Sequence, residues 1–355
     1  MCAFALNLTD QPGDTVSDQV TIKEIADKTG FSLMTVSRAL NNKPYVKKKT
    51  KEEIFAVAEK LGYTANHIAK SLVSNKTNII GVVVPEISHS FFPEVIKGIE
   101  EVIHEANYQL LFAQSDEDCL REKSAVQTFI SQRVDGILIS MSETTKDFEL
   151  FHTIKNRGIP LVFFDRCVYD IGLSCVAIDN KKSAQIVTEY LISNGYRRIA
   201  HLICSNAPGV GDKRLEGYKC ALKNNNILFD QELVAECGFD KVSGYKAMKN
   251  LLNLPGDRWP EAVVTVNDPT AYGAMKAIKE SGMQIPEDMA IIGFSNDIIS
   301  NLMTPSLTTV KQPAYEIGKK ASQKLLSHIS NSSDPVETIF LETELIIRDT
   351  CTGKI

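Results

Sequence analysis

Long apolar runs are missing from this sequence of 355 residues, and none approaches the ~20 residues that a membrane-spanning helix needs. The densest stretches, Ile79–Val84 and Ala290–Phe294, are much shorter, so we expect no membrane partner. Residues 1–19 contain a Pro-Gly pair and no lysine or arginine, so the basic start of a secretory signal is absent. We therefore expect a disordered extension at 1–19 and a cytoplasmic protein.

Cysteines with metal-binding spacing are also missing. The eight cysteines are scattered, no two form a Cys-x-x-Cys pair, and the six histidines do not gather near them. A metal site needs clustered ligands, so we expect neither a metal nor another cofactor. Free thiols in a reducing compartment are the expected state of the cysteines. They stand at Cys2, Cys119, Cys167, Cys175, Cys204, Cys220, Cys237 and Cys351.

The motifs of common enzyme classes are missing as well. Gly209-Val-Gly211 lacks the third glycine of a dinucleotide fingerprint, because Arg214 stands in its place. The sequence has no Gly-Lys-Ser/Thr phosphate loop and no Gly-x-Ser-x-Gly nucleophile motif. We therefore expect a binding protein and not an enzyme.

An excess of positive charge is present, but in one region only. The whole chain has a net charge of −5, whereas residues 20–76 hold 11 lysines and arginines against 5 acidic residues, a local charge of +6. An acidic protein with one basic end is typical of a protein that holds a polyanion by that end. A basic face that only contacts solvent is the alternative, and charge alone does not exclude it.

The basic region has the pattern of three short helices. Thr21 followed by Glu24 is a capping box at the start of the first, and Gly30 supplies a turn after it. Ser32 can cap a second helix at Leu33–Leu40, and Thr50–Leu61 forms a third. Two short helices joined at a glycine turn are typical of a DNA-binding helix-turn-helix. A helical hairpin without function is the alternative.

The second helix would be the one that enters the major groove. Arg38 can bind O6 and N7 of guanine together, whereas Leu33 and Met34 can contact thymine methyl groups. The expected packing contacts between the two helices come from Ile25, Ala26, Val36 and Leu40. The predicted DNA-contacting residues of this region, several of them suited to phosphate, are Thr21, Lys23, Ser32, Leu33, Met34, Thr35, Ser37 and Arg38.

Beyond Asn78 the pattern changes to apolar strands that alternate with amphipathic helices. This pattern predicts an α/β fold whose parallel sheets are covered on both faces, and the number of units favours two lobes. The candidate strands are Ile79–Val84, Gln109–Ala113, Gly136–Ser140, Pro160–Phe164, Ile199–Cys204, Ala262–Val266 and Ala290–Phe294. The candidate helices are Glu94–Glu105, Ala184–Ser193, Tyr245–Leu252 and Tyr272–Ser281.

The N-terminal motifs resemble the headpiece of the lactose-repressor (LacI/GalR) family, and the resemblance to the family extends over about residues 20–350. They are Val20-Thr21-Ile22, Gly30-Phe31-Ser32, Thr35-Val36-Ser37-Arg38, Leu40-Asn41 and Leu61-Gly62-Tyr63. The resemblance implies a helix-turn-helix headpiece at 20–65, a hinge helix and linker at 66–77, and a two-lobed domain of the type I periplasmic-binding-protein fold at 78–350. It also implies that the chain crosses between the lobes near 165–180 and 295–313.

The hinge segment is similar to the family's hinge helix, in which a leucine from each of two subunits enters the minor groove. Leu72 holds that position here, with Lys70 where the family often has arginine. An apolar side chain inserted between base pairs bends the duplex. The resemblance therefore adds Asn66, Ala69, Lys70 and Leu72 to the predicted DNA-binding residues.

The two-lobed domain is similar to the family's effector pocket at positions that follow several of the candidate strands. Aromatic faces stack on sugar rings, and Asp, Asn, Gln and Arg side chains bind hydroxyl groups. Two positions depart from the common pattern, since Ser295 stands where many members have Asp and His89 where many have Asn. An anionic effector is therefore one alternative to a neutral sugar. The predicted effector-binding residues are His89, Phe91, Phe92, Asp165, Arg166, Arg214, Phe239, Asn267, Ser295 and Gln312.

The resemblance implies a ligand-responsive transcription regulator, with a repressor favoured, that binds a pseudo-palindromic operator in double-stranded DNA as a homodimer. The sequence ends six residues after Asp349 without the leucine heptads of tetrameric relatives, which favours the dimer. Its effector would be a sugar or sugar derivative. A solute-binding protein with a vestigial DNA-binding head remains the alternative, and the sign of the ligand's effect on DNA binding stays open.

Overall fold

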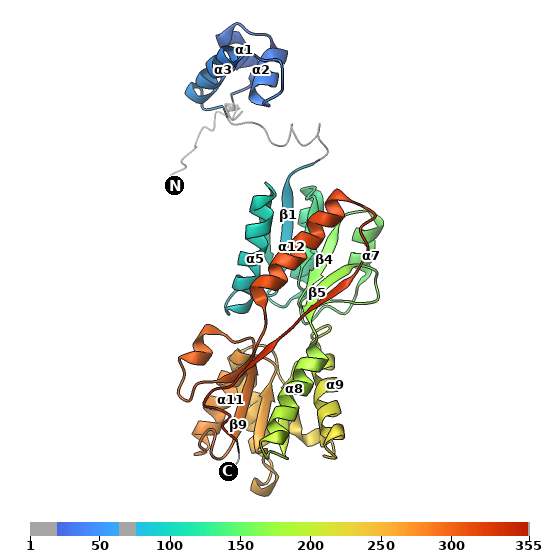
Figure 1. Ribbon diagram of the computed structural model, residues 1–355, viewed down its shortest axis with the longest axis vertical. Coiled ribbons are helices and arrows are strands. Elements are labelled where there is room, and N and C mark those ends of the chain that lie inside the picture. Colours follow the sequence, from blue (N-terminus) through green and yellow to red (C-terminus); the bar gives the residue numbers. More distant parts are fainter. Residues whose placement is uncertain (1–19, 64–75, 354–355) are drawn as a thin grey trace, which may run out of the picture. The chain divides into compact units, whose positions relative to one another are not determined.

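A computed structural model describes residues 20–63 and 76–353 of the chain (Figure 1). They belong to two compact units, divided between Asn75 and Lys76. None of the helices in these ranges has both the length and the apolar character needed to cross a membrane. The predicted hinge residues lie outside the described ranges; they are Asn66, Ala69, Lys70 and Leu72.

The first unit is the predicted three-helix headpiece. Its helices are α1 (Ile22–Thr29), α2 (Leu33–Leu40) and α3 (Lys48–Lys60). They surround a small apolar core in which Ile25, Val36 and Ile54 are fully buried. Ala39 is buried as well, whereas Leu40, which was expected to lock the helix pair, is only half-buried at the edge of this core.

The first lobe of the second unit is built on a six-stranded sheet in the order β11-β5-β4-β3-β1-β2, with every pair parallel. Helices α5 and α12 pack against each other on this lobe (Figure 1). Its elements are β1 (Ile79–Val84), α5 (Phe91–Glu105), β2 (Gln109–Gln114), α6 (Cys119–Ser131), β3 (Gly136–Ile139), α7 (Glu149–Asn156), β4 (Leu161–Phe164), β5 (Ser174–Ile178), α12 (Ala314–Ser330) and β11 (Thr338–Leu341).

The second lobe repeats this plan in a six-stranded sheet ordered β12-β10-β9-β8-β6-β7, in which only β12 is antiparallel to its neighbour. Helix α8 packs on α9, and α10 on α11. Its helices are α8 (Asn180–Ser193), α9 (Gly211–Asn224), α10 (Lys241–Leu252) and α11 (Asp268–Glu280), with short 3-10 turns at η1 (Gln231–Leu233), η2 (Gly256–Arg258) and η3 (Ile298–Asn301). Its strands are β6 (Ile199–Ile203), β7 (Val234–Glu236), β8 (Ala262–Thr265), β9 (Ala290–Phe294), β10 (Thr308–Lys311) and β12 (Glu344–Ile346).

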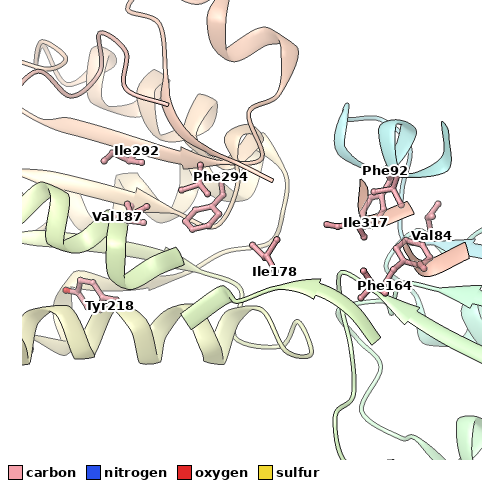
Figure 2. Close-up of a cluster of buried hydrophobic side chains, with 14 of the residues drawn as sticks. Val84, Phe92, Phe164, Ile178, Val187, Tyr218, Ile292, Phe294 and Ile317 are labelled. Atoms are coloured by element: carbon pink, nitrogen blue, oxygen red, sulfur yellow. The ribbon is translucent and has the colours of Figure 1, made fainter. Parts of the chain in front are cut away.

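Within residues 76–353 the chain passes between the lobes three times. The passages follow Ile178, Lys311 and Leu341, the ends of strands β5, β10 and β11. The last of them, drawn in red in Figure 1, was not expected from the sequence. One cluster of buried apolar residues includes side chains of both lobes, and Figure 2 shows Ile178 between Phe294 and Phe164.

The structure confirms the predicted α/β class with two parallel-sheet lobes and corrects several boundaries. Three helices begin about one turn earlier than the apolar pattern indicated, because polar side chains cap the preceding turn. Asp179, Asp240 and Asn267 accept hydrogen bonds from backbone N–H groups at the starts of α8, α10 and α11. Helix α3 also begins early, at Lys48 and not at Thr50.

The expectation of free thiols throughout is wrong for two cysteines. Cys167 and Cys175 form a disulfide whose Cα atoms are 6.0 Å apart. Cys167 follows β4 closely, and Cys175 lies on β5 opposite Phe163 of β4. Since the connection between these neighbouring strands is short, the two side chains return to the same edge of the sheet.

Candidate functional site

Helix α2, the second helix of the helix-turn-helix, has an exposed face that carries both polar and apolar side chains. The Thr21 and Glu24 capping box is formed, and Gly30 ends α1 with φ at 73°, a backbone conformation that favours glycine. Leu33 is 53% exposed and Met34 63% exposed, so much of two apolar side chains is in contact with solvent. Such side chains are suited to contact with base edges.

The remaining predicted headpiece residues differ in how far their side chains are exposed to solvent. Lys23 and Arg38 are exposed, while Thr35 and Ser37 are half-buried on the same helix-turn-helix. The Ser32 hydroxyl accepts a hydrogen bond from the backbone of Thr35 at 3.2 Å and so caps α2. Because this hydroxyl already holds the helix end, the role of Ser32 in the described structure is to position α2.

The second unit holds a cavity that brings together all ten residues predicted to bind an effector. It encloses about 510 Å³ of empty space, part of it open to solvent, and the residues come from both lobes. This size falls within the range of small-molecule pockets. Four further residues line it that the sequence analysis did not name: Glu86, Val210, Val266 and Pro269. No cluster of three potential metal ligands exists within 20–63 and 76–353.

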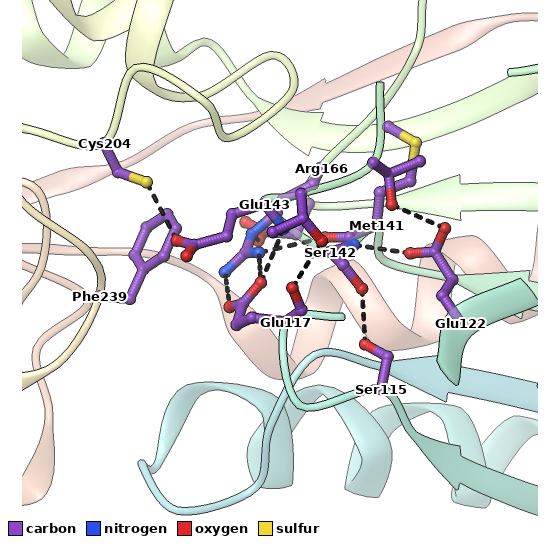
Figure 3. A network of polar contacts seen from close by, with 12 residues as sticks. Ser115, Glu117, Glu122, Met141, Ser142, Glu143, Arg166, Cys204 and Phe239 are labelled. Carbon is purple, nitrogen blue, oxygen red and sulfur yellow. Dashed lines mark hydrogen bonds and ion pairs between the residues drawn. The ribbon is translucent and has the colours of Figure 1, made fainter. Parts of the chain in front are cut away.

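Arg166 is held in the cavity wall by a bidentate ion pair. Its Nη1 and Nη2 donate to the two carboxylate oxygens of Glu117 at 2.6 and 2.8 Å, as Figure 3 shows, and Nη1 also donates to the Met141 carbonyl. The guanidinium lies over the Phe239 ring, 4.2 Å from its centre. Its charge is thus balanced within the first lobe, and its flat face is fixed against an aromatic wall from the second lobe.

Asp165 lies beside this pair with a positive φ of 60° and is nearly buried. Burial raises the pKa of Asp165 above its ordinary value, and the charges of Arg166 and Arg214 oppose that shift. The neighbouring Gln312 side chain also opposes the rise in the pKa. A carboxylate held in this way can accept hydrogen bonds from ligand hydroxyl groups.

Arg214 is the second buried cation of the cavity and has different partners. Its Nε donates to Asn180 Oδ1 at 2.9 Å, and its Nη1 donates to the Val266 carbonyl. The guanidinium stacks on the Phe294 ring, with its central carbon 3.9 Å from the ring centre. Burial lowers the pKa of Arg214 to about 10, which leaves the side chain charged at neutral pH.

Aromatic side chains supply the apolar part of the cavity. Phe91 and Phe92 begin α5 and meet edge to face, with ring centres 5.1 Å apart. Phe239 enters from the second lobe, where the Asn267 amide donates to its carbonyl at 2.8 Å. The Asn267 amide oxygen also caps α11, so Asn267 fixes the wall as well as lining it.

The two positions that depart from the family pattern both line this cavity. Ser295 follows β9 with φ at 110°, and its backbone N–H donates to the Val310 carbonyl at 2.8 Å. His89 precedes α5, and its backbone N–H donates to Glu86 at 3.2 Å. Neither position brings a carboxylate into the cavity.

Several supporting residues escaped the sequence analysis because their partners are distant in the chain. Glu117 and Arg166 are 49 positions apart, and Asn180 and Arg214 are 34 apart. The Cys204 thiol, whose pKa burial raises to about 12, donates to Glu143 of the other lobe at 3.2 Å (Figure 3). Glu86 lines the cavity, whereas Glu117 holds Arg166 in its wall. Only their positions shortly after strands could have indicated that they lie near the cavity.

Comparison with known proteins agrees with a helix-turn-helix regulator that carries a periplasmic-binding-protein-like domain. Residues 21–66 match the family described as bacterial regulatory proteins, lacI family. Residues 77–348 match the periplasmic binding proteins and sugar binding domain of the LacI family. The chain belongs to the LacI family and is a DNA-binding transcription regulator.

Curated relatives extend over nearly the whole chain. The probable HTH-type transcriptional repressor ExuR of Bacillus subtilis (strain 168) is 38% identical over 334 residues, which cover 93% of this chain and 98% of the relative. The ribose operon repressor of Halalkalibacterium halodurans is 31% identical over 335 residues, covering 94% and 97%. Both relatives are repressors by name.

Solved structures show the same architecture. A transcriptional regulator CelR–cellobiose complex has a TM-score of 0.71 at 27% identity and covers 94% of this chain and 100% of its own. A LacI-family regulator from Enterococcus faecium with bound ribose has a TM-score of 0.67 at 28% identity, covering 77% and 98%. The lac repressor dimer bound to operator and the anti-inducer ONPF, with a TM-score of 0.83 at 24% identity and coverage of 94% and 99%, supports the fold alone.

Proposed function

We propose that this regulator is a homodimeric repressor that reads a pseudo-palindromic operator through α2 and responds to a small polyol in the cavity of its second unit. The observation that carries the proposal is the convergence of ten predicted effector residues from both lobes on one cavity. We also propose that the protein acts in the cytoplasm, and that it acts by binding DNA and a ligand and not by catalysis.

The DNA-reading part of the proposal rests on the exposed face of α2. Arg38 reads guanine, Leu33 and Met34 contact thymine methyl groups or groove shape, and Lys23 holds phosphate. The basic charge of residues 20–76 supplies the sequence-independent attraction to the duplex. In the same proposal, the Leu72 side chain enters the minor groove, with Asn66, Ala69 and Lys70 beside it.

The effector part rests on the chemistry of the cavity. The cavity is lined by aromatic rings together with buried charged and amide groups, which fit a ligand with an apolar ring face and several hydroxyl groups. A ligand that contacts both lobes favours one relative arrangement of the lobes over others. By linkage, it changes DNA affinity by the same factor by which DNA changes ligand affinity.

Exposed apolar side chains on the second lobe support self-association. Ile298 is 73% exposed and Leu302 75% exposed, and Ile299 between them is half exposed. These three side chains belong to η3 and the residue after it. A cluster of large apolar side chains in solvent is typical of an interaction surface. We assign this surface to the second copy of the chain.

Operator selection from a random duplex library tests the DNA-reading proposal. The full-length protein should enrich a sequence with two related half-sites, and the Arg38→Ala variant should lose that enrichment while keeping weak, salt-sensitive binding. Arg157→Ala serves as the control, because Arg157 is an exposed arginine of the second unit. Enrichment of the same sequence by Arg38→Ala would show that α2 does not read the operator in this way.

A further inference from the structure

The Cys167–Cys175 disulfide lies where the cavity meets a passage between the lobes. Cys167 follows Asp165 and Arg166, which line the cavity, and Cys175 lies on β5. Strand β5 ends at Ile178, where the chain first passes into the second lobe. The bond therefore joins the segment that carries two cavity residues to the strand that leads out of the lobe, and a change in the bond acts on both.

The loop that the disulfide closes also contacts the second lobe. Gly209 lies so close to it that a Cβ atom on Gly209 would be 3.0 Å from the Cys167 carbonyl oxygen and 3.3 Å from the Tyr169 ring. The Gly209 carbonyl in turn accepts a hydrogen bond at 3.1 Å from the side-chain amide of Asn180, at the start of α8. The position of this loop is thus coupled to the position of the second lobe.

The same loop contacts the strand that leads into another passage. The centre of the Tyr169 ring lies 6.3 Å from that of Phe340 on β11, and β11 ends at Leu341, where the chain passes to the second lobe. From α7, Lys155 Nζ donates to the Ile171 carbonyl of the loop at 3.0 Å. The loop therefore contacts both lobes, and two of the three passages leave from strands that it touches.

The sulfur atoms are shielded from solvent. Cys167 is 2% exposed and Cys175 is fully buried, and both lie among the apolar side chains of the first lobe. Thiol–disulfide exchange requires a thiolate to reach a sulfur atom, so the bond reacts only when the loop moves. Because Gly209 lies against the Cys167 carbonyl, opening of the lobes frees the loop for this movement.

We propose that Cys167 and Cys175 form a redox switch that controls the arrangement of the lobes around the cavity and thereby the affinity of the regulator for its operator. In the oxidised form the bond holds Asp165 and Arg166 in the cavity wall. In the reduced form the loop loses this constraint, and the lobes separate more readily at Gly209.

This switch rests on the proposed function and adds a second signal to it, the thiol–disulfide state of the cell. The proposed function places the protein in the cytoplasm, where disulfides are rare and those that form are usually transient or redox-sensing. A change in the arrangement of the lobes alters DNA affinity by the same coupling through which a ligand in the cavity acts.

A low-molecular-weight thiol such as glutathione supplies the electrons for reduction. The thiolate of one molecule attacks a sulfur of the bond, which forms a mixed disulfide and releases the other cysteine as a thiolate. A second thiol molecule then displaces the protein from the mixed disulfide. Two protein thiols, which take up the protons of the two attacking thiols, and one glutathione disulfide result. Oxidation by glutathione disulfide reverses these steps.

A redox titration of the full-length protein tests the switch. The protein is equilibrated with glutathione and glutathione disulfide at ratios that extend from a reducing to an oxidising compartment, and its free thiols are then alkylated. Mass spectrometry measures the oxidised fraction of Cys167 and Cys175. We expect one reversible two-electron transition within this series. A pair that stays oxidised at every ratio, as a fixed structural bond would, or that stays reduced at every ratio would overturn the proposal.

Hydrogen–deuterium exchange and operator binding then compare the two redox forms of the unmutated chain. Reduction should speed exchange in residues 165–175 and around Gly209, and it should change the Kd for the operator duplex selected from the random library by about fivefold or more. Cys167→Ser should behave like the reduced form at every glutathione ratio. Cys119→Ser, which removes a free thiol of α6, should respond as the parent protein does.

Failure of the switch can be distinguished from failure of the proposed function. An operator Kd that is equal in the two redox forms, with or without a change in hydrogen exchange, would overturn the switch and leave the regulator standing. A protein that selects no operator in either redox form would instead contradict the proposed function itself.

Discussion

Ser90 and Asp297 connect the two lobes directly. The backbone N–H of Ser90 donates to Asp297 Oδ2 at 3.1 Å, and the Ser90 hydroxyl donates to the same oxygen at 2.7 Å. Ser90 stands at the start of α5 in the first lobe, and Asp297 follows β9 in the second. The contact therefore lies where opening of the lobes would break it.

The second lobe holds Asp297 firmly from behind. Its backbone N–H donates to Asp268 at 2.7 Å, and Tyr272 donates to its side chain at 3.3 Å. Asp268 is fully buried and also accepts hydrogen bonds from Ser300 and Thr309. Movement of Asp297 relative to its own lobe is thus restricted, so the Ser90 contact reports on the arrangement of the lobes.

Removal of the Ser90 hydroxyl should loosen this arrangement. Ser90→Ala deletes one hydrogen bond to a charged group, and we expect the free energy of unfolding to fall by about 1–3 kcal/mol. Urea denaturation measures the change, with Ser124→Ala, an exposed serine of α6, as the control. Equal stability of Ser90→Ala and the parent protein would show that the lobe contact contributes nothing in solution.

His201 should make the second lobe sensitive to acid. Its Nδ1 hydrogen-bonds the Val264 carbonyl at 3.1 Å, and burial lowers its pKa from 6.5 to about 4. His201 therefore resists protonation in the folded state, whereas in the unfolded chain it takes up a proton near the ordinary pKa of histidine. Stability should fall as the pH drops from 6.5 towards 4, by about 3 kcal/mol in total.

The His201→Gln variant isolates this contribution from the acidic residues that titrate in the same range. The difference in the free energy of unfolding between the parent protein and His201→Gln should shift in favour of the variant as the pH falls. Chemical denaturation at a series of pH values measures it. Parallel pH profiles of the two proteins would contradict the assignment.

Reduction of the disulfide should destabilise the first lobe. Cys167 and Cys175 close a short loop directly after Asp165 and Arg166, so the bond restricts the unfolded chain and the segment that carries two cavity residues. A loop of this length predicts about 2–3 kcal/mol of stabilisation. A reductant or Cys167→Ser should lower the denaturation midpoint, whereas Cys119→Ser should not. A midpoint that does not respond to reductant would show that both thiols are free in solution.

The apolar surface of η3 should control self-association. Leu302→Asp places a charge among exposed apolar side chains and should shift the protein from dimer to monomer. Analytical ultracentrifugation measures the mass, and Leu228→Asp is the matched control, since Leu228 is 93% exposed outside η3. If both variants keep the mass of the parent dimer, the interface lies elsewhere.

Local signals in the sequence predicted much of this structure. The capping box of Thr21 and Glu24 involves neighbours in the chain, so the start of α1 could be predicted from the sequence. The cavity residues were identified by a resemblance and by their positions after strands, where the carboxyl ends of a parallel sheet meet. The structure brings them together, while their contacts with a ligand stay predictions.

Contacts between distant residues could not be predicted in the same way. Strand β11 alternates exposed and half-buried residues and was overlooked, and with it the third passage between the lobes. The pairing of Glu117 with Arg166, 49 positions apart in the chain, depends on tertiary packing and could be seen only in the structure.

The central claim is that a ligand in the cavity changes the affinity of the headpiece for DNA, and one titration tests it most directly. Fluorescence anisotropy would measure the Kd for the selected operator duplex with and without a saturating concentration of the sugar or sugar derivative that the protein binds most tightly. We predict a change of about tenfold or more in one direction, as expected for coupled sites, and no change in Arg214→Gln. An operator Kd that stays the same at saturating ligand in the parent protein would contradict the account.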